Sequence, residues 1–237
     1  MSMKRTAFLA ASASALAASG AIAQAQAVPG GTHLVERKAD FDADAFAKIV
    51  GRDAQIRSVV ETVAFKPGVL NNIKNEFNGL QFGFGYPAAA IAIALAGHGP
   101  SAAYGYSDYV WKKYRIGEFF DLKNGDGKPI STNAFVAAQT PADTAADPDD
   151  PKGMYQDTSI EGLQRRGLIL LTCHTAVEEQ SRALVKRGFA PAGTTPSQVA
   201  ADILTHLVVG AVVVPSMVAA VTVLQATYHY SYITLTL

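Results

Sequence analysis

Short apolar stretches alternate with amphipathic stretches along most of the chain, and this alternation restricts the possible folds more than any other feature. Residues 88–96, 168–172 and 211–214 are almost free of polar side chains, as is typical of strands covered on both faces. Residues 57–65 and 230–235 are rich in β-branched and aromatic side chains and predict two further strands. The chain therefore predicts an α/β fold with an open, mostly parallel five-stranded sheet.

Helical patterns fill the intervals between these strands. Apolar side chains recur at helical spacing between Val69 and Leu80. Thr158, Thr175 and Thr195 are each followed three residues later by Glu or Gln, which predicts a capping box and a helix start at each threonine. Helices that connect parallel strands by right-handed crossovers cover both faces of the sheet. The expected architecture is flavodoxin-like or Rossmann-like.

The first 27 residues have the pattern of a secretory signal peptide. Lys4 and Arg5 precede an Ala-rich stretch, and Ala25-Gln26-Ala27 offers a small-x-small cleavage site. The stretch is too short and too interrupted to span a membrane. The sequence therefore predicts a signal peptide over residues 1–27 and a single domain over residues 28–237, located in the periplasm or secreted. The choice between the Sec route and a twin-arginine-like route stays open.

Charge and motif content exclude several classes of function. The chain has 20 basic and 20 acidic residues, and loss of Lys4 and Arg5 with the signal peptide leaves 18 basic residues, without the excess of a nucleic-acid-binding protein. Phosphate-binding, dinucleotide-binding, G-x-S-x-G and H-E-x-x-H motifs are absent from the sequence. A calcium loop around Gly127 would place Leu122 at the first ligand position, where it cannot coordinate. We predict no cofactor and no metal.

Residues 115–157 interrupt the regular alternation. The segment combines Asn124-Gly125-Asp126-Gly127, which is typical of a turn, with a Pro- and Asp-rich stretch over residues 140–153. We interpret it as an irregular insertion and expect it to be mobile or weakly packed on the sheet.

The best candidates for chemistry follow two of the apolar strands. Cys173, the only cysteine, comes directly after residues 168–172, and His98 follows residues 88–96. The carboxyl ends of parallel strands are where ligands and reactive groups gather. A helix start beside Cys173 favours the thiolate form, and His174 could add a donor or a proton acceptor. A lone cysteine after an apolar strand is also often a buried core residue, and His98 could simply shape a turn.

These segments resemble the DsrE/DsrF-like family of small sulfur-relay proteins, in its exported branch. The resemblance lies in LILLTCHTAVEEQSRALVKRG (168–188), in VVVPSMVAAVTVLQATYHYSYI (212–233) and in AIAIALAGHGP (90–100). It implies that Cys173 carries a persulfide and passes it to a partner, and that the protein forms homo-oligomers. The signal peptide and the insertion at residues 115–157 depart from the cytoplasmic members of that family.

Two hypotheses of function follow. In the first, Cys173 handles sulfur by carrying a persulfide or exchanging with thiols, and its partner is an unknown donor or acceptor protein or a small thiol. In the second, the protein is a non-catalytic periplasmic ligand-binding or assembly module with a structural Cys173, and a small ligand occupies the region of His98 and Trp111. Exposure of Cys173 distinguishes them, since a reactive carrier needs an accessible sulfur. Whether the protein is an enzyme is left open.

Overall fold

The computed structural model describes residues 35–140 and 147–236, so the expected signal peptide lies outside the described residues. Five strands form one open sheet in the order β4-β3-β2-β1-β5, and all four pairings are parallel. Their bounds are β1 Ile56–Thr62, β2 Ile91–Gly97, β3 Leu168–Cys173, β4 Val212–Val214 and β5 Ser231–Leu235. The predicted α/β class with a Rossmann-like parallel sheet is confirmed.

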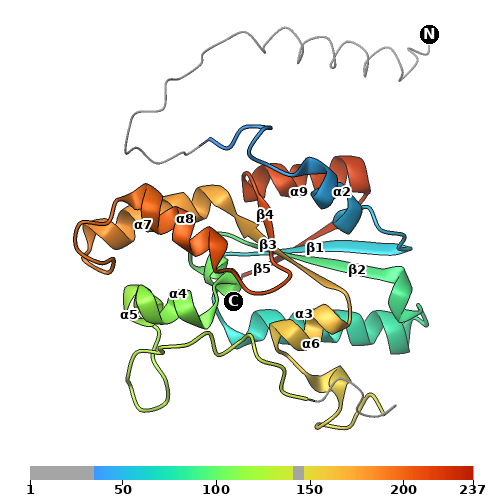
Figure 1. The fold of residues 1–237 in the computed structure, drawn as a ribbon. Coiled ribbons are helices and arrows are strands. Elements are labelled where there is room, and N and C mark those ends of the chain that lie inside the picture. Colours follow the sequence, from blue (N-terminus) through green and yellow to red (C-terminus); the bar gives the residue numbers. More distant parts are fainter. Residues whose placement is uncertain (1–34, 141–146, 237) are drawn as a thin grey trace, which may run out of the picture. The chain divides into compact units, whose positions relative to one another are not determined.

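Helices cover both faces of this sheet, as Figure 1 shows with α2 and α9 above it and α3 and α6 below it. From β1 to β4 the chain moves one strand at a time in one direction, and then returns past β1 to form β5. Because such crossovers are right-handed, reversal of the direction moves the connecting helix to the opposite face. The described part of the chain forms the α-helices α2 Ala43–Val50, α3 Pro67–Asn78, α4 Asp108–Lys113, α5 Ile116–Phe119, α6 Ile160–Arg165, α7 His174–Lys186, α8 Pro196–Thr205 and α9 Met217–Tyr228.

The pleat of β2 explains why its sequence is apolar throughout. Ile91, Ile93 and Leu95 point into the cluster that contains α3, α6, α7 and α8 side chains. The alternate residues Ala92, Ala94 and Ala96 point into the cluster formed with α2 and α9. Small alanine side chains on that face leave room for α9 to pack close to the sheet. Because helices cover both faces of β2, neither face can carry polar side chains, and the whole strand is apolar.

The insertion is anchored more firmly than its sequence suggests. Asn133 is buried, and its Nδ2 donates hydrogen bonds to the carbonyl oxygens of Ala103, Tyr104 and Tyr106 at 3.1, 3.1 and 2.9 Å. Asp157, also buried, accepts hydrogen bonds from the backbone amides of Gln139, Thr140 and Ser159. Two buried side chains therefore fix the insertion to the rest of the domain, although most of residues 121–139 are exposed or half-buried; that the segment is mobile stays a prediction.

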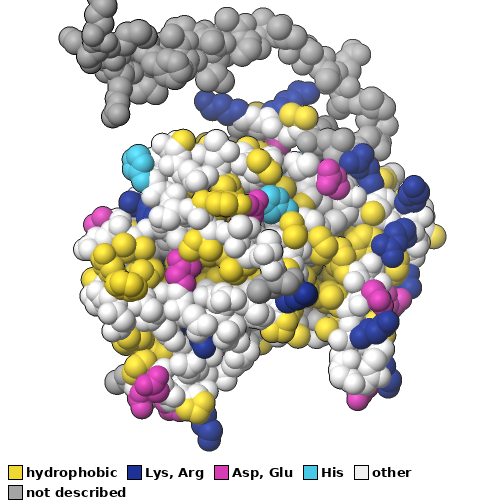
Figure 2. Space-filling model, turned by 180° about the vertical axis from the view of Figure 1, so that it is seen from behind, with side chains coloured by type: hydrophobic (Ala, Val, Ile, Leu, Met, Phe, Trp, Pro, Cys, Tyr) yellow, Lys and Arg dark blue, Asp and Glu magenta, His cyan; other side chains and the backbone are white. Residues whose placement is uncertain are grey.

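Charged side chains of both signs are visible on one face of the molecule (Figure 2). On the face seen in Figure 2, acidic and basic side chains are interspersed, with apolar side chains between them. None of the helices in residues 35–140 and 147–236 combines the length and the apolar character needed to cross a membrane.

Candidate functional site

The sulfur of Cys173 lies where the amino-terminal ends of two helices meet. Cys173 is the last residue of β3 and the N-cap of α7, and its Sγ accepts a hydrogen bond from the Ala176 amide at 3.4 Å. Its Sγ also accepts a hydrogen bond from the amide of Met217, the first residue of α9, at 3.3 Å. Two helices therefore direct backbone amide donors of their first turns at one sulfur.

The helix after β3 begins two residues before the expected position. The pattern Thr175 to Glu178 predicts a capping box, but Cys173 is the cap and Thr175 lies within α7. The Thr175 hydroxyl instead donates to the Pro215 carbonyl at 2.9 Å. This bond joins the turn after β3 to the turn after β4, and so it holds the two amide donors around the sulfur.

Cys173 is buried in this structure, with 5% of its surface exposed. It belongs to the apolar cluster between the sheet and helices α2 and α9, together with Ala102, Val214 and Met217. The sulfur is polarised but covered, so any reaction at Cys173 requires a local opening.

His98 forms a polar cluster of its own at the carboxyl edge of the sheet. Its backbone amide donates to the Thr62 carbonyl at 3.1 Å and extends the β1–β2 ladder by one residue. Its Nε2 pairs with Oε1 of Glu61, whose other oxygen accepts a hydrogen bond from the Tyr232 hydroxyl. By the alternation of the strands, Glu61 and His98 share the sheet face that carries Cys173, but no hydrogen bond or ion pair links either of them to Cys173 among the described residues.

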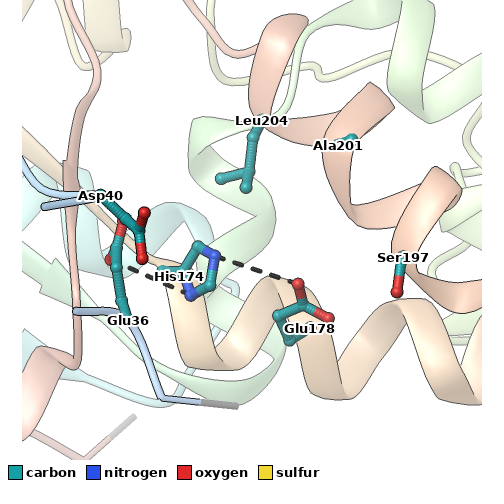
Figure 3. Close-up of a pocket in the computed structure, with 7 residues that line it drawn as sticks. All are labelled: Glu36, Asp40, His174, Glu178, Ser197, Ala201 and Leu204. Carbon is teal, nitrogen blue, oxygen red and sulfur yellow. Dashed lines mark ion pairs between the residues drawn. The ribbon is translucent and has the colours of Figure 1, made fainter. Parts of the chain in front are cut away.

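His174 points into a separate pocket of about 280 Å³ (Figure 3). Its Nδ1 lies 3.9 Å from Glu36 Oε2, and its Nε2 lies 3.9 Å from Glu178 Oε1. Asp40 lies beside Glu36, and α8 closes the pocket with Ser197, Ala201 and Leu204. The imidazole is therefore held between two carboxylates. Although Cys173 and His174 are adjacent in sequence, the cysteine side chain lies in the apolar cluster and the histidine side chain lies in the pocket.

This pocket is acidic, and the structure shows one electrostatic consequence. Burial, with the charge of Asp40 as a second cause, raises the pKa of Glu36 above its ordinary value. No group of three or more histidine, cysteine or acidic side chains within the described residues has the geometry to hold a metal ion. A positively charged or hydrogen-bond-donating group suits this pocket better than an anion.

Several of these residues have no signal in the sequence. Glu36 and Asp40 precede the first described helix in an irregular stretch, so nothing local relates them to His174. Glu61 could have been noticed as the one carboxylate of its strand, directly after Val59 and Val60. The hydrogen bond from Met217 comes from its backbone amide, so the type of residue at this position does not predict it. Trp111, proposed above as part of a ligand region, is fully buried in the core and packs on the ring of Phe65, so its side chain presents no open surface to a ligand.

Comparison with known proteins gives no match to a family model, to a curated protein or to a solved structure.

Proposed function

We propose that this protein is an exported DsrE-like sulfur-handling protein that carries sulfane sulfur, or exchanges with thiols, at Cys173. One observation supports the proposal above the others: Sγ of Cys173 accepts backbone hydrogen bonds from the first turns of both α7 and α9. Two amide donors at Sγ stabilise a thiolate there. In a persulfide the negative charge moves to the outer sulfur, one bond further from these amides, while Sγ still accepts their hydrogen bonds.

The proposed step is a sulfur transfer between thiols. The Cys173 thiolate attacks the outer sulfur of a donor persulfide, R–S–S–H. A new sulfur–sulfur bond forms at Cys173, the sulfur–sulfur bond of the donor breaks, and the donor leaves as its thiolate, R–S⁻. Transfer to an acceptor thiol reverses these changes on a different partner. The donor and acceptor are proteins or small thiols, and a homo-oligomer is the expected assembly.

The burial of Cys173 supports a second candidate, a non-catalytic binding module. In that case the sulfur serves only as the cap of two helices, and a ligand occupies the pocket of Glu36, His174 and Glu178. The acidic lining favours an amine or another cationic group rather than an anion.

Mass spectrometry of the intact protein after incubation with polysulfide separates the two candidates. The sulfur-handling proposal expects a gain of one or more sulfur atoms that dithiothreitol removes. Cys173→Ser is the matched control, because it changes the side chain little in size and replaces the sulfur by an oxygen that can still accept hydrogen bonds. No gain in the native protein, with a gain after unfolding in urea, would show that Cys173 is a structural thiol and would leave the binding module.

A further inference from the structure

Arginine side chains gather at the amino edge of the sheet, opposite the edge that carries Cys173. Arg52 precedes β1, Ala88 and Ala89 precede β2, and Arg165 and Arg166 precede β3. All five line one pocket of about 360 Å³. Its volume falls within the range of small-molecule sites.

The arginines of this pocket have no acidic partner within the described residues. Arg52 donates to the carbonyl oxygens of Ile91 and Gly167 at 2.6 and 3.1 Å. Arg165 donates to the Thr140 carbonyl at 3.0 Å. None of the three arginines takes part in an ion pair with a described residue, and no described carboxylate lines the pocket. Three neighbouring cations repel one another when nothing neutralises them.

Arg166 is the strongest sign that a ligand is needed. Its side chain is stacked between the rings of Phe77 and Tyr155, and only 8% of the residue is exposed. Its Nη2 is buried and has no hydrogen-bond partner among the described residues. Burial lowers the pKa of Arg166 to about 10, which leaves it charged at neutral pH. A buried cation with an unused donor is costly, and an anion that accepts from it would offset that cost.

We propose that this pocket binds the phosphate or sulfate group of a small molecule through Arg52, Arg165 and Arg166. Guanidinium groups match the oxygen spacing of such tetrahedral anions and bind them by paired hydrogen bonds. Gln81, which also lines the pocket, supplies an amide that can contact the rest of the molecule. The site is independent of the function proposed for Cys173.

Isothermal titration of the purified protein, at ionic strength matched with sodium chloride, tests the proposal with inorganic phosphate, sulfate, glucose 6-phosphate and glucose. Saturable binding is expected for the anions and not for glucose. Tighter binding of glucose 6-phosphate than of inorganic phosphate would identify an organic ester as the ligand class, whereas equal affinity would identify the free anion. Absence of saturable binding of any anion up to about 10 mM would overturn the proposal.

Arginine variants assign the binding to this pocket. Arg165→Gln is expected to weaken anion binding about tenfold or more, because each charge-assisted contact contributes strongly. It is the primary variant, since Arg165 is exposed and its loss should not affect folding; Arg166→Gln is the second. Arg187→Gln is the matched control, because Arg187 also donates to a carbonyl, that of Phe119, and stacks on two rings away from the pocket. Equal weakening in Arg165→Gln and Arg187→Gln would reflect general charge and overturn the assignment.

Discussion

At the residue scale, Cys173 occupies a position that serine, threonine or aspartate usually takes at the start of a helix. Its sulfur serves α7 and α9 together, since Ser216, the N-cap residue of α9, makes no side-chain capping bond. The sequence predicts a cap near this point, but it favours Thr175, because a threonine followed by Glu178 is the commoner capping pattern. The second cap arises because β4 lies beside β3 and brings the start of α9 to Cys173. No pattern of neighbouring residues in the sequence predicts that contact.

Substitution of Cys173 should reveal how much these two bonds stabilise the fold. Cys173→Ser keeps an acceptor in the same place, whereas Cys173→Ala leaves two buried amides without a partner. We expect the alanine variant to have a free energy of unfolding about 1–2 kcal/mol below that of the serine variant. Urea denaturation followed by circular dichroism measures the difference. Equal stability of the two variants would show that the hydrogen bonds to sulfur contribute nothing.

Asp157 provides a pH-dependent test at the same scale. Burial raises its pKa, but hydrogen bonds from Ser159 and Thr140 outweigh burial and hold the pKa below its ordinary value. A carboxyl group with a lowered pKa stabilises the folded state above its unfolded pKa, and this contribution is lost as the pH falls through the folded pKa. Asp157→Asn should therefore lower the urea midpoint at pH 7 and do so progressively less below about pH 4. A difference that is constant between pH 7 and pH 3 would contradict this account.

At the scale of elements, the sequence predicts the strands well, but it does not predict the contacts that anchor the insertion. All five strands are found within a few residues of their expected positions, because a strand covered on both faces needs a continuous apolar run such as Ile91–Gly97. The capping box at Thr195 is confirmed, and the cap expected at Thr158 is Ser159 instead. The anchoring of the insertion depends on single polar side chains that bond residues far away in sequence, and such contacts have no periodicity.

The Asn133 side chain gives the test of that anchoring. Asn133→Asp replaces a donor that serves three carbonyl oxygens with a carboxylate that they repel. We expect a loss of about 2–4 kcal/mol in the free energy of unfolding at pH 7. Asn124→Asp is the matched control, because Asn124 uses only its Oδ1 as an acceptor, from the amides of Asp126 and Lys128, and a carboxylate keeps that role. Similar small effects at both positions would mean that the insertion does not depend on Asn133.

At the scale of the whole molecule, the strand order places two polar regions at opposite edges of one sheet. The alternation in the sequence predicts parallel strands, but not that β1 lies between β2 and β5. That order brings Glu61, His98 and Tyr232 together at the carboxyl edge. The arginine pocket lies at the amino edge, because the segments that enter β1, β2 and β3 meet there. The carboxyl edge therefore holds the sulfur and the two helix ends, while the amino edge holds three arginines that form no ion pair with a described residue.

The last prediction concerns how Cys173 becomes accessible. A sulfur carrier needs the sulfur exposed by a local opening, which costs less free energy than global unfolding of about 5–15 kcal/mol. Alkylation by iodoacetamide in the native protein, relative to the unfolded chain, measures the free energy of that opening. We expect it to be well below the free energy of unfolding found in the same buffer and nearly independent of low urea concentrations, since a local opening exposes little surface. If alkylation instead follows global unfolding with the full urea dependence, Cys173 is accessible only in the unfolded chain. The sulfur would then act as a cap for α7 and α9, and the binding module would remain.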